Sequence, residues 1–554
     1  MIKKLESPWT VALLALFFFV PFLGNVHLFD WDEINFAESA REMLVTQNYL
    51  RVQVNYQPFW EKPPLFFWLQ VLSMRVFGVN EFAARFPNAL LGLITLLTFF
   101  YVGKRLIDKR FGFLWALAYL GSFTPHLYFK SGIIDPTFNY FMFLSVLNLA
   151  SAAFLFKENQ NGSQTWQFLL AGLFAGLAVW TKGPVGVGVP TLTLAAVWAT
   201  NGFRPVVSLK NLLIYGLTAG LVSAGWVALM IVESGWSTFV AFLEYLYRLG
   251  ATSEADHGEP FYYHFVVVLV GCFPISVLGM KYLIPKFVNQ ATAQNTRVAV
   301  FSQFMLALFW VVMIVFSIVK TKIVHYSSMA YFPLSFLAVL HLYRWLEGKI
   351  SWPRWATVLT GIIGFLAAFV LAAVPLVGIY APQISPYLND KFTVANLQAP
   401  VDWGGWEWAI GAVYGSAVLG CLLIWQKRKW LAVKTLFLST AVCLLIYTAI
   451  VVPKIEAYSQ RTVIDFYESK RGQDVYVSPV GFHSYAQLYY FEKPAGRRPE
   501  ASDENWLLNG PVDKPTFLIA RIDRADVYYA NRNLQLIKEE NGFVFFKRKD
   551  PLLQ

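Results

Sequence analysis

The chain has 554 residues, of which 56% are hydrophobic, 17% aromatic and only 14% charged. This composition excludes an ordinary soluble protein and is typical of a protein that crosses a membrane many times. The formal net charge of +11 is also compatible with nucleic-acid binding. However, the basic residues are spread over alternate connections between apolar runs and form no single patch, which makes nucleic-acid binding a remote alternative.

Apolar runs long enough to span a bilayer as a helix recur along residues 1–453. Hydropathy, interrupted by charges and by Pro or Gly, predicts about thirteen transmembrane helices. They are expected at 8–28, 83–102, 111–129, 133–156, 166–181, 183–200, 211–232, 261–284, 299–319, 325–346, 354–380, 406–426 and 430–452. No small-residue cleavage site follows the first run, so we expect a retained helix and not a signal peptide.

Lysine and arginine clusters in alternate connections predict the orientation of the chain in the membrane. They occur around residues 3–4, 104–110, 204–210, 281–297, 344–354 and 427–434. By the positive-inside rule these connections face the cytoplasm, and those between them face the periplasm. An odd number of spans then places the C-terminal residues outside. We therefore expect a multi-pass protein of the bacterial inner membrane.

After Pro453 the composition becomes more polar and short β-like runs appear. They lie at 475–477, 516–520 and 534–537, the last followed across Asn541-Gly542 by 543–546. Asn-Gly near two apolar runs favours a hairpin, here with a loop longer than two residues. We predict a transmembrane domain over residues 1–453, including an outer loop at 29–82, and a small periplasmic α/β domain over residues 454–554.

The three cysteines, Cys272, Cys421 and Cys443, lie inside apolar segments without paired spacing. This pattern supports neither a disulfide framework nor a zinc finger. We expect three buried thiols.

The unusual polar residues gather on the predicted outer face. If they were only structural, they would scatter over both faces of the membrane, and ionisable groups there are costly unless they bind or catalyse something. Instead, all of them map to outer connections or adjoining helix ends: Asp32, Glu33, Glu61, Lys62, Asp135, Lys182, Arg248, His257, Lys320, Lys322 and His325. The sequence therefore predicts an ionisable site on the outer face, as expected for a membrane enzyme.

The first outer loop carries the densest group of charges. We expect a helix to begin near Asp32, because the residues of one face would be apolar: Phe36, Ala40, Met43 and Leu44. Prolines at 58, 63 and 64 favour a stiff, extended segment that holds Glu61 and Lys62. Residues 65–76 are apolar but short for a span, which indicates an interfacial helix in the membrane plane.

Each of these residues also has a structural interpretation. Asp32 and Asp135 both stand where an aspartate would cap a helix. Lys182 ends an apolar run, where lysines commonly extend toward the lipid head groups. The neighbours Glu61 and Lys62 are also compatible with a surface ion pair. The location of the whole set on one face favours function over these separate explanations.

Two acidic groups beside several cations at a membrane surface suit the transfer of a group from a lipid phosphate. Lysine and arginine neutralise the charge that develops on a departing phosphate. A carboxylate acts as general base for an acceptor hydroxyl or stabilises an oxocarbenium-like sugar. Glu61 and His257 offer oxygen and nitrogen ligands to a divalent metal ion, the one candidate cofactor, although a loop histidine is most often simply solvated.

Several motifs, in order along most of the membrane region, resemble the bacterial lipid-linked sugar transferases. They are Asp32-Glu33, Ala37-Glu38, Arg41-Glu42-Met43, Phe59-Trp60-Glu61-Lys62-Pro63-Pro64, Ile134-Asp135-Pro136, Thr181-Lys182-Gly183, Phe261-Tyr262-Tyr263 and the run from Lys320 to Tyr326. This family includes the aminoarabinose transferase of lipid A and bacterial relatives of protein O-mannosyltransferases. The resemblance implies a mainly α-helical, polytopic C-type glycosyltransferase fold with periplasmic loop helices and a small α/β soluble C-terminal domain.

The resemblance also implies inverting transfer of a sugar from a polyprenyl-phosphate donor to a lipid A, glycan or protein acceptor. Asp32 matches the main catalytic carboxylate and Asp135 the second acidic position. The positions expected to bind substrate or its phosphate are Glu33, Lys62, Lys182, Arg248, Lys322 and Tyr326. Glu61 matches a metal-associated glutamate, with His257 as its partner from the later loop. Two positions depart from the family: Asn35 stands where arginine is frequent, and Tyr245 replaces a histidine.

A transporter or flippase of lipid-linked sugars is the alternative from another class. Such a protein would show paired interrupted helices in two related halves and charge near the bilayer midplane. The sequence has no recognisable halves of this kind, and its unusual charges lie at one face. It therefore favours a glycosyltransferase.

Overall fold

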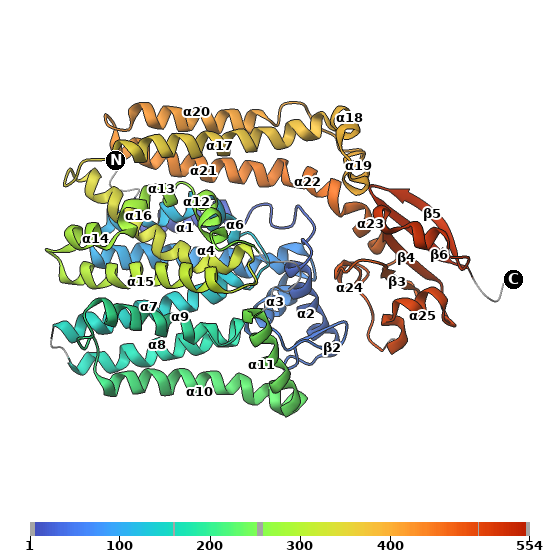
Figure 1. Ribbon diagram of the computed structural model, residues 1–554, viewed down its shortest axis with the longest axis horizontal. Helices are drawn as coiled ribbons and strands as arrows, with labels where there is room; N and C mark the ends of the chain where they lie inside the picture. Colours follow the sequence, from blue (N-terminus) through green and yellow to red (C-terminus); the bar gives the residue numbers. More distant parts are fainter. Residues whose placement is uncertain (1–5, 159–160, 252–258, 497, 550–554) are drawn as a thin grey trace.

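Long helices that run side by side make up most of the molecule (Figure 1). The computed structural model describes residues 6–158, 161–251, 259–496 and 498–549. Within them, six of the predicted spans are single helices long and apolar enough to cross a membrane. They are α4 (Glu81–Leu106), α7 (Asp135–Lys157), α10 (Leu209–Ser234), α15 (Thr296–Ile318), α17 (Arg354–Ile379) and α21 (Lys429–Ile450). The predicted mainly α-helical, multi-pass architecture is confirmed.

Most of the other predicted spans are shorter or broken helices, and the span predicted at 166–181 is the 22-residue helix α8 (Asn161–Lys182). The span predicted at 261–284 is not one continuous helix, because α12 (Tyr263–Gly271) is followed by α13 (Ile275–Gly279) and η2 (Met280–Leu283) at an angle of 108°. Pro274 lies at this break, where its ring and missing N–H prevent a continuous helix. The remaining helices of the bundle are α1 (Pro8–Phe19), α5 (Lys109–Leu120), α6 (Phe123–Tyr128), α8 (Asn161–Lys182), α9 (Val185–Thr200), α14 (Pro285–Thr292), α16 (Tyr331–Leu346) and α20 (Ala409–Ile424).

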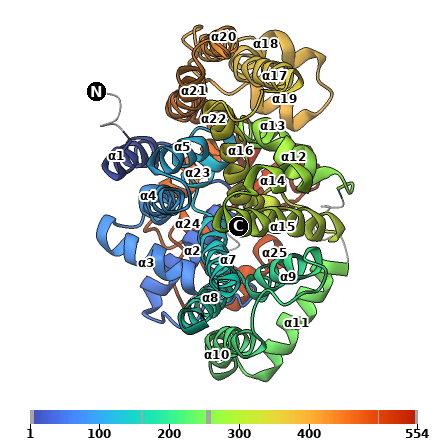
Figure 2. The ribbon, with the colours of Figure 1, turned by 90° about the vertical axis from the view of Figure 1, so that its left-hand side faces the viewer.

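Close packing between neighbouring helices holds the bundle together, as the view along its axis shows (Figure 2). Between α4 and α5, the rings of Phe99 and Trp115 stack with centroids 4.5 Å apart. Gly112 lies so near α4 that a Cβ atom there would come within 2.2 Å of the Phe100 carbonyl oxygen. Small residues thus allow the close helix approach that stabilises membrane bundles. Cys272, Cys421 and Cys443 are buried and free, which confirms the prediction for them.

The first outer loop and the C-terminal region lie at the same end of the bundle, on the right of Figure 1. The loop forms α2 (Asp32–Thr46), the strands β1 (Gln53–Val54) and β2 (Gln57–Pro58), and α3 (Leu65–Phe77). The helix predicted to start near Asp32 therefore does so. Later segments near this end are α11 (Trp236–Ala251), η3 (Val324–Ala330), α18 (Ala381–Ile384), η4 (Ser385–Tyr387) and α19 (Lys391–Leu397).

The C-terminal region builds a four-stranded sheet with helices around it. The strands are β3 (Tyr476–Pro479), β4 (Thr516–Arg521), β5 (Leu534–Glu540) and β6 (Phe543–Arg548), in the order β3-β4-β6-β5. Strands β3 and β4 are parallel and the other pairs antiparallel. The helices are α22 (Val452–Ser459), α23 (Arg461–Ser469), α24 (Ala486–Tyr489), η5 (Pro499–Ser502), α25 (Glu504–Asn509), η6 (Ile522–Arg524) and α26 (Asp526–Tyr529).

The hairpin predicted at Asn541-Gly542 is present, but its loop has a different length from the one expected. Strand β5 continues to Glu540 through an irregularity between Leu536 and Lys538, so only two residues join it to β6. Asn541 and Gly542 both have positive φ, 49° and 79°. This is the backbone of a two-residue type I′ turn, for which Asn-Gly is the preferred sequence. The expectation of a longer loop was wrong.

Candidate active site

Most of the buried charges of α2 are paired within the protein. The Arg41 guanidinium donates to both carboxylate oxygens of Glu38 at 2.7 Å. Glu42 accepts a hydrogen bond from the backbone N–H of Tyr56 at 2.8 Å. Burial, together with the neighbouring Glu38 carboxylate, raises the pKa of Glu42 to about 9. These side chains hold α2 against the β1–β2 hairpin.

Glu33 fixes the segment that leads into α2. Its carboxylate accepts hydrogen bonds from Arg85 at 2.7 and 3.0 Å, and from the backbone N–H groups of Phe29 and Gly132. Burial alone would raise the pKa of Glu33, but the Arg85 guanidinium and the backbone N–H groups of Gly132 and Phe29 together outweigh it, and the pKa is lowered. Arg85 also donates to backbone carbonyls in 23–27. Glu33 was expected to bind substrate, yet both its oxygens hold the protein's own loop in place.

Arg85→Ala is expected to destabilise the protein by about 3–5 kcal/mol, because it leaves the Glu33 carboxylate buried without its partner. Loss of thermal stability of the purified protein in detergent measures the effect. Arg105→Ala, an exposed arginine at the other end of the same helix α4, is the matched control. Equal melting temperatures for the two variants would contradict this role for Arg85.

Two aspartates that begin helices come together at the end of the bundle where α2 and the C-terminal region lie. Asp32 is the first residue of α2 and Asp135 the first residue of α7, and neither helix has a side-chain cap at its N-terminus. Lys182, the last residue of α8, donates from Nζ to Asp135 Oδ1 at 2.6 Å. Its side chain is only 17% exposed. Lys182 therefore points into the protein and not toward the head groups, and capping does not explain either aspartate.

The imidazole ring of His325 lies between the two aspartates. Its Nε2 atom lies 3.7 Å from Asp32 Oδ2 and 3.9 Å from Asp135 Oδ2. Burial lowers the pKa of His325, with Asp135 opposing the shift, which favours the neutral imidazole. The sequence placed His325 on the outer face but gave it no role. The one-sided distribution of ionisable residues was the signal that marked it.

A second cation stands beside this group. Lys62 Nζ lies 3.9 Å from Glu61 Oε2 and 5.6 Å from the centre of the Tyr245 ring. Lys182 Nζ lies 5.2 Å from the centre of the Tyr326 ring, so each lysine faces an aromatic side chain. Burial lowers the pKa of Lys62, partly opposed by the Glu61 carboxylate. An anion placed between the two lysines would favour their charged forms.

Two adjoining cavities meet at these side chains. The larger, of about 630 Å³, is lined by polar groups that include Asp32, Glu33, His325 and Tyr485. The smaller, of about 190 Å³, is mostly apolar and is lined by Phe138, Met142, Val185, Leu246, Phe316 and Val319, among others. Five residues line both: Glu61, Lys62, Lys182, Tyr245 and Tyr326. The lysines therefore stand where a strongly apolar cavity opens into a more polar one, which is called the polar cavity below.

The C-terminal region also reaches this site. Tyr485 lines the polar cavity, its ring meets Trp31 edge-on at 5.0 Å, and its backbone N–H donates to Asp30 Oδ1 at 3.3 Å. Burial raises the pKa of Asp30. Neither Tyr485 nor Asp30 carries a sequence signal, because their proximity exists only after the chain has folded.

Two of the predicted site residues that the structure describes do not line the cavities. Arg248 is exposed on α11 and is not among the residues that line either one. Lys322 is buried but does not line them, and its Nζ donates to the backbone carbonyl of Lys320 at 3.5 Å. His257 lies outside the described residues.

The predicted metal pair is therefore represented by Glu61 alone in the described part of the chain. Around Glu61 this part supplies no group of three metal-ligating side chains at suitable spacing. Tyr245, which takes the place of the histidine in the family pattern, faces Lys62. Because His257 lies outside the described residues, the metal pair of Glu61 and His257 stays a prediction.

The sequence is similar to those of known transferases. The family model for dolichyl-phosphate-mannose-protein mannosyltransferases matches residues 61–229. An undecaprenyl phosphate-α-4-amino-4-deoxy-L-arabinose arabinosyl transferase of Aeromonas hydrophila is 28% identical over 409 residues, which cover 72% of this chain and 71% of that protein. Another such transferase, from Proteus mirabilis, is 25% identical, and the matched region covers 80% of this chain and 77% of that protein.

The same fold is found in a solved structure. ArnT from Cupriavidus metallidurans, crystallised with undecaprenyl phosphate, superposes with a TM-score of 0.74 at 18% identity and covers 98% of both chains. The chain therefore has a membrane-embedded fold of the C-type glycosyltransferase architecture. In sequence the chain is similar to bacterial undecaprenyl-phosphate aminoarabinose transferases, and over residues 61–229 to dolichyl-phosphate-mannose-protein mannosyltransferases.

Proposed function

We propose that this protein transfers a sugar from a polyprenyl-phosphate donor to an acceptor hydroxyl at the outer face of the inner membrane. The observation that carries the proposal is the position of Lys62 and Lys182 between the apolar and the polar cavity. A lipid phosphate needs this combination, because its chain requires an apolar channel and its charge requires cations. The arabinosyl transferases similar to this chain are named for an undecaprenyl-phosphate sugar, which supports the same donor class.

The proposed reaction assigns a place to each part of the donor. The first isoprene units enter the apolar cavity, the phosphate lies between Lys62 and Lys182, and the sugar extends into the polar cavity toward Asp32. The acceptor oxygen attacks the anomeric carbon, and the bond from that carbon to the phosphate oxygen breaks. Polyprenyl phosphate leaves with the bonding electrons, and the two lysines stabilise its charge. Attack from the face opposite the phosphate inverts the anomeric configuration.

Asp32 is the proposed general base. Its side chain is 33% exposed and lies in the polar cavity, whereas that of Asp135 is 4% exposed and paired with Lys182. Asp32 can therefore meet an acceptor hydroxyl and take its proton. Asp135 keeps Lys182 directed into the site. Neutral His325, between the two carboxylates, is a neighbour to which Asp32 can pass the proton.

The test is transfer by the purified protein from undecaprenyl-phosphate sugars, beginning with 4-amino-4-deoxy-L-arabinose, to lipid A and then to glycan and peptide acceptors. Product formation with release of undecaprenyl phosphate is the expected result. A flippase would instead move the intact donor across a proteoliposome membrane without breaking the glycosidic bond. Translocation in the absence of any bond cleavage would replace the transferase proposal with that alternative.

The orientation in the membrane is a further prediction. Gln57→Cys and Asp526→Cys are expected to react with a membrane-impermeant thiol reagent added to intact spheroplasts. Lys104→Cys and Lys427→Cys are expected to react only after the membrane is opened. The native cysteines are buried, so they give little background. Labelling of Lys104→Cys but not Gln57→Cys in spheroplasts would put the site on the cytoplasmic side and refute the orientation.

A further inference from the structure

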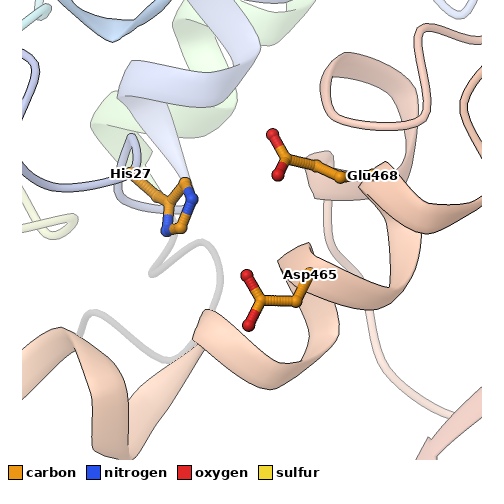
Figure 3. A group of neighbouring side chains, drawn as sticks. All are labelled: His27, Asp465 and Glu468. Atoms are coloured by element: carbon orange, nitrogen blue, oxygen red, sulfur yellow. The ribbon is translucent and has the colours of Figure 1, made fainter.

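A second cluster of ionisable side chains lies between the first outer loop and the C-terminal region (Figure 3). His27 comes from the loop between α1 and α2, while Asp465 and Glu468 stand one turn apart on α23. One ligand atom from each of the three lies within 4.8 Å of the other two. The cluster is separate from the cavities, since none of its members lines either one.

A buried carboxylate orients His27. Its Nδ1 atom lies 3.0 Å from Oε1 of Glu456, whose side chain is fully buried, while the His27 side chain is 21% exposed. Arg461 holds the other carboxylate oxygen of Glu456 at 2.6 and 2.9 Å. With Nδ1 hydrogen-bonded in this way, Nε2 is the atom left to act as a ligand. Metal-binding histidines usually have this arrangement, in which a carboxylate accepts from the second ring nitrogen.

We propose that His27, Asp465 and Glu468 form a site for a divalent metal ion of the zinc type. One imidazole nitrogen and two carboxylates are ligands that zinc accepts, and water would complete the coordination. Tetrahedral bonds of about 2.0–2.2 Å require ligand atoms about 3.3–3.6 Å apart. The Asp465 and Glu468 side chains are exposed and can rotate inward to meet this requirement. Glu468 would exchange its ion pair with Arg471, at 3.2 Å, and exposed pairs of this kind contribute little to stability.

The ion would connect two parts of the chain that meet beside the active site. Gln460 already donates to the Leu28 carbonyl at 2.9 Å, and the Leu28 N–H donates to the Tyr490 hydroxyl at 2.6 Å. Metal ligation at His27 would add a further attachment, five residues before Asp32. The site would thus hold the loop that carries the proposed general base against the C-terminal region.

The experiment is zinc binding by the full-length protein in detergent after treatment with a chelator. Zinc chloride is titrated, bound zinc is measured by equilibrium dialysis and mass spectrometry, and the melting temperature is followed in parallel. One equivalent of zinc at micromolar affinity or tighter, with a rise in melting temperature, is expected. His27→Ala and Asp465→Asn should each weaken binding by at least about tenfold. Asp465 is exposed, so its variant is expected to fold even if His27→Ala does not.

Two controls make the assignment specific. His483→Ala removes an exposed histidine of the same C-terminal region and is expected to bind zinc like the unmodified protein. Glu61→Gln should also bind one equivalent of zinc, and this result would distinguish the proposed site from a zinc site at Glu61. Absence of zinc binding, or equal affinity in Asp465→Asn and His483→Ala, would overturn the proposal and leave His27 as an ion-pair partner of Glu456 alone.

Discussion

Asp32→Asn is expected to reduce sugar transfer by about 100- to 10,000-fold, the usual contribution of a general base. Asparagine has almost the same shape as aspartate but cannot accept the proton of the acceptor hydroxyl. Asp32 makes no capping hydrogen bond in α2 and its side chain is one-third exposed, so the fold should be retained. The measurement is the turnover rate of the purified variant with saturating donor and acceptor.

The matched control is Asp526→Asn, an exposed aspartate of the C-terminal region that lines neither cavity. Both variants should elute and melt like the unmodified protein, and only Asp32→Asn should lose transfer. Transfer at a rate near that of Asp526→Asn would remove Asp32 from the mechanism. His325 or Asp135 would then be the groups to test as the base.

Lys62→Ala and Lys182→Ala are expected to impair use of the lipid-phosphate donor by about tenfold to over a hundredfold. This is the range for a charge-assisted contact of roughly 1.5–3 kcal/mol. Lys182→Ala should also lower the melting temperature, because Asp135 loses its 2.6 Å partner inside the protein. Lys62→Ala is the cleaner probe, since its nearest carboxylate, on Glu61, is 45% exposed. Lys62→Arg should retain part of the activity if charge matters more than geometry.

The measurement is turnover against donor concentration for each variant. The control is Lys104→Ala, which removes an exposed lysine in the last turn of α4. Lys322→Ala should resemble this control, because Lys322 does not line the cavities. If Lys62→Ala also behaves like the control, the two lysines do not bind the donor phosphate, and the proposed function loses its main physical support.

Asp32 and Glu33 are adjacent in the sequence, but their carboxylates have different partners in the structure. Both are carboxylates at the start of α2, and both were expected at the site. Both line the polar cavity, but the Glu33 carboxylate is bound by Arg85 on α4, whereas the Asp32 side chain is one-third exposed. The partner of Glu33 is 52 residues away. No local pattern shows which of two adjacent acids will meet a distant arginine.

Local chemistry explains most of what could be predicted about the fold. Long apolar runs such as those of α15 and α17 must form helices, because a bilayer leaves no other partner for the backbone N–H and C=O groups. The bend at Pro274 was missed, because hydropathy measures how apolar a segment is and not its direction. The hairpin at Asn541-Gly542 was located, but the end of β5 depended on pairing with β6.

The sequence by itself therefore determined the membrane architecture, the helix at Asp32 and the concentration of ionisable residues on one face. These features follow from local composition and from the cost of placing charge in lipid. Only the tertiary structure decided which of those residues meet. It joins Asp135 to Lys182 across 47 positions, sets His325 between two aspartates and brings Tyr485 from the C-terminal region to the cavity. Such contacts depend on how helices pack against one another, and that is a property of the whole chain.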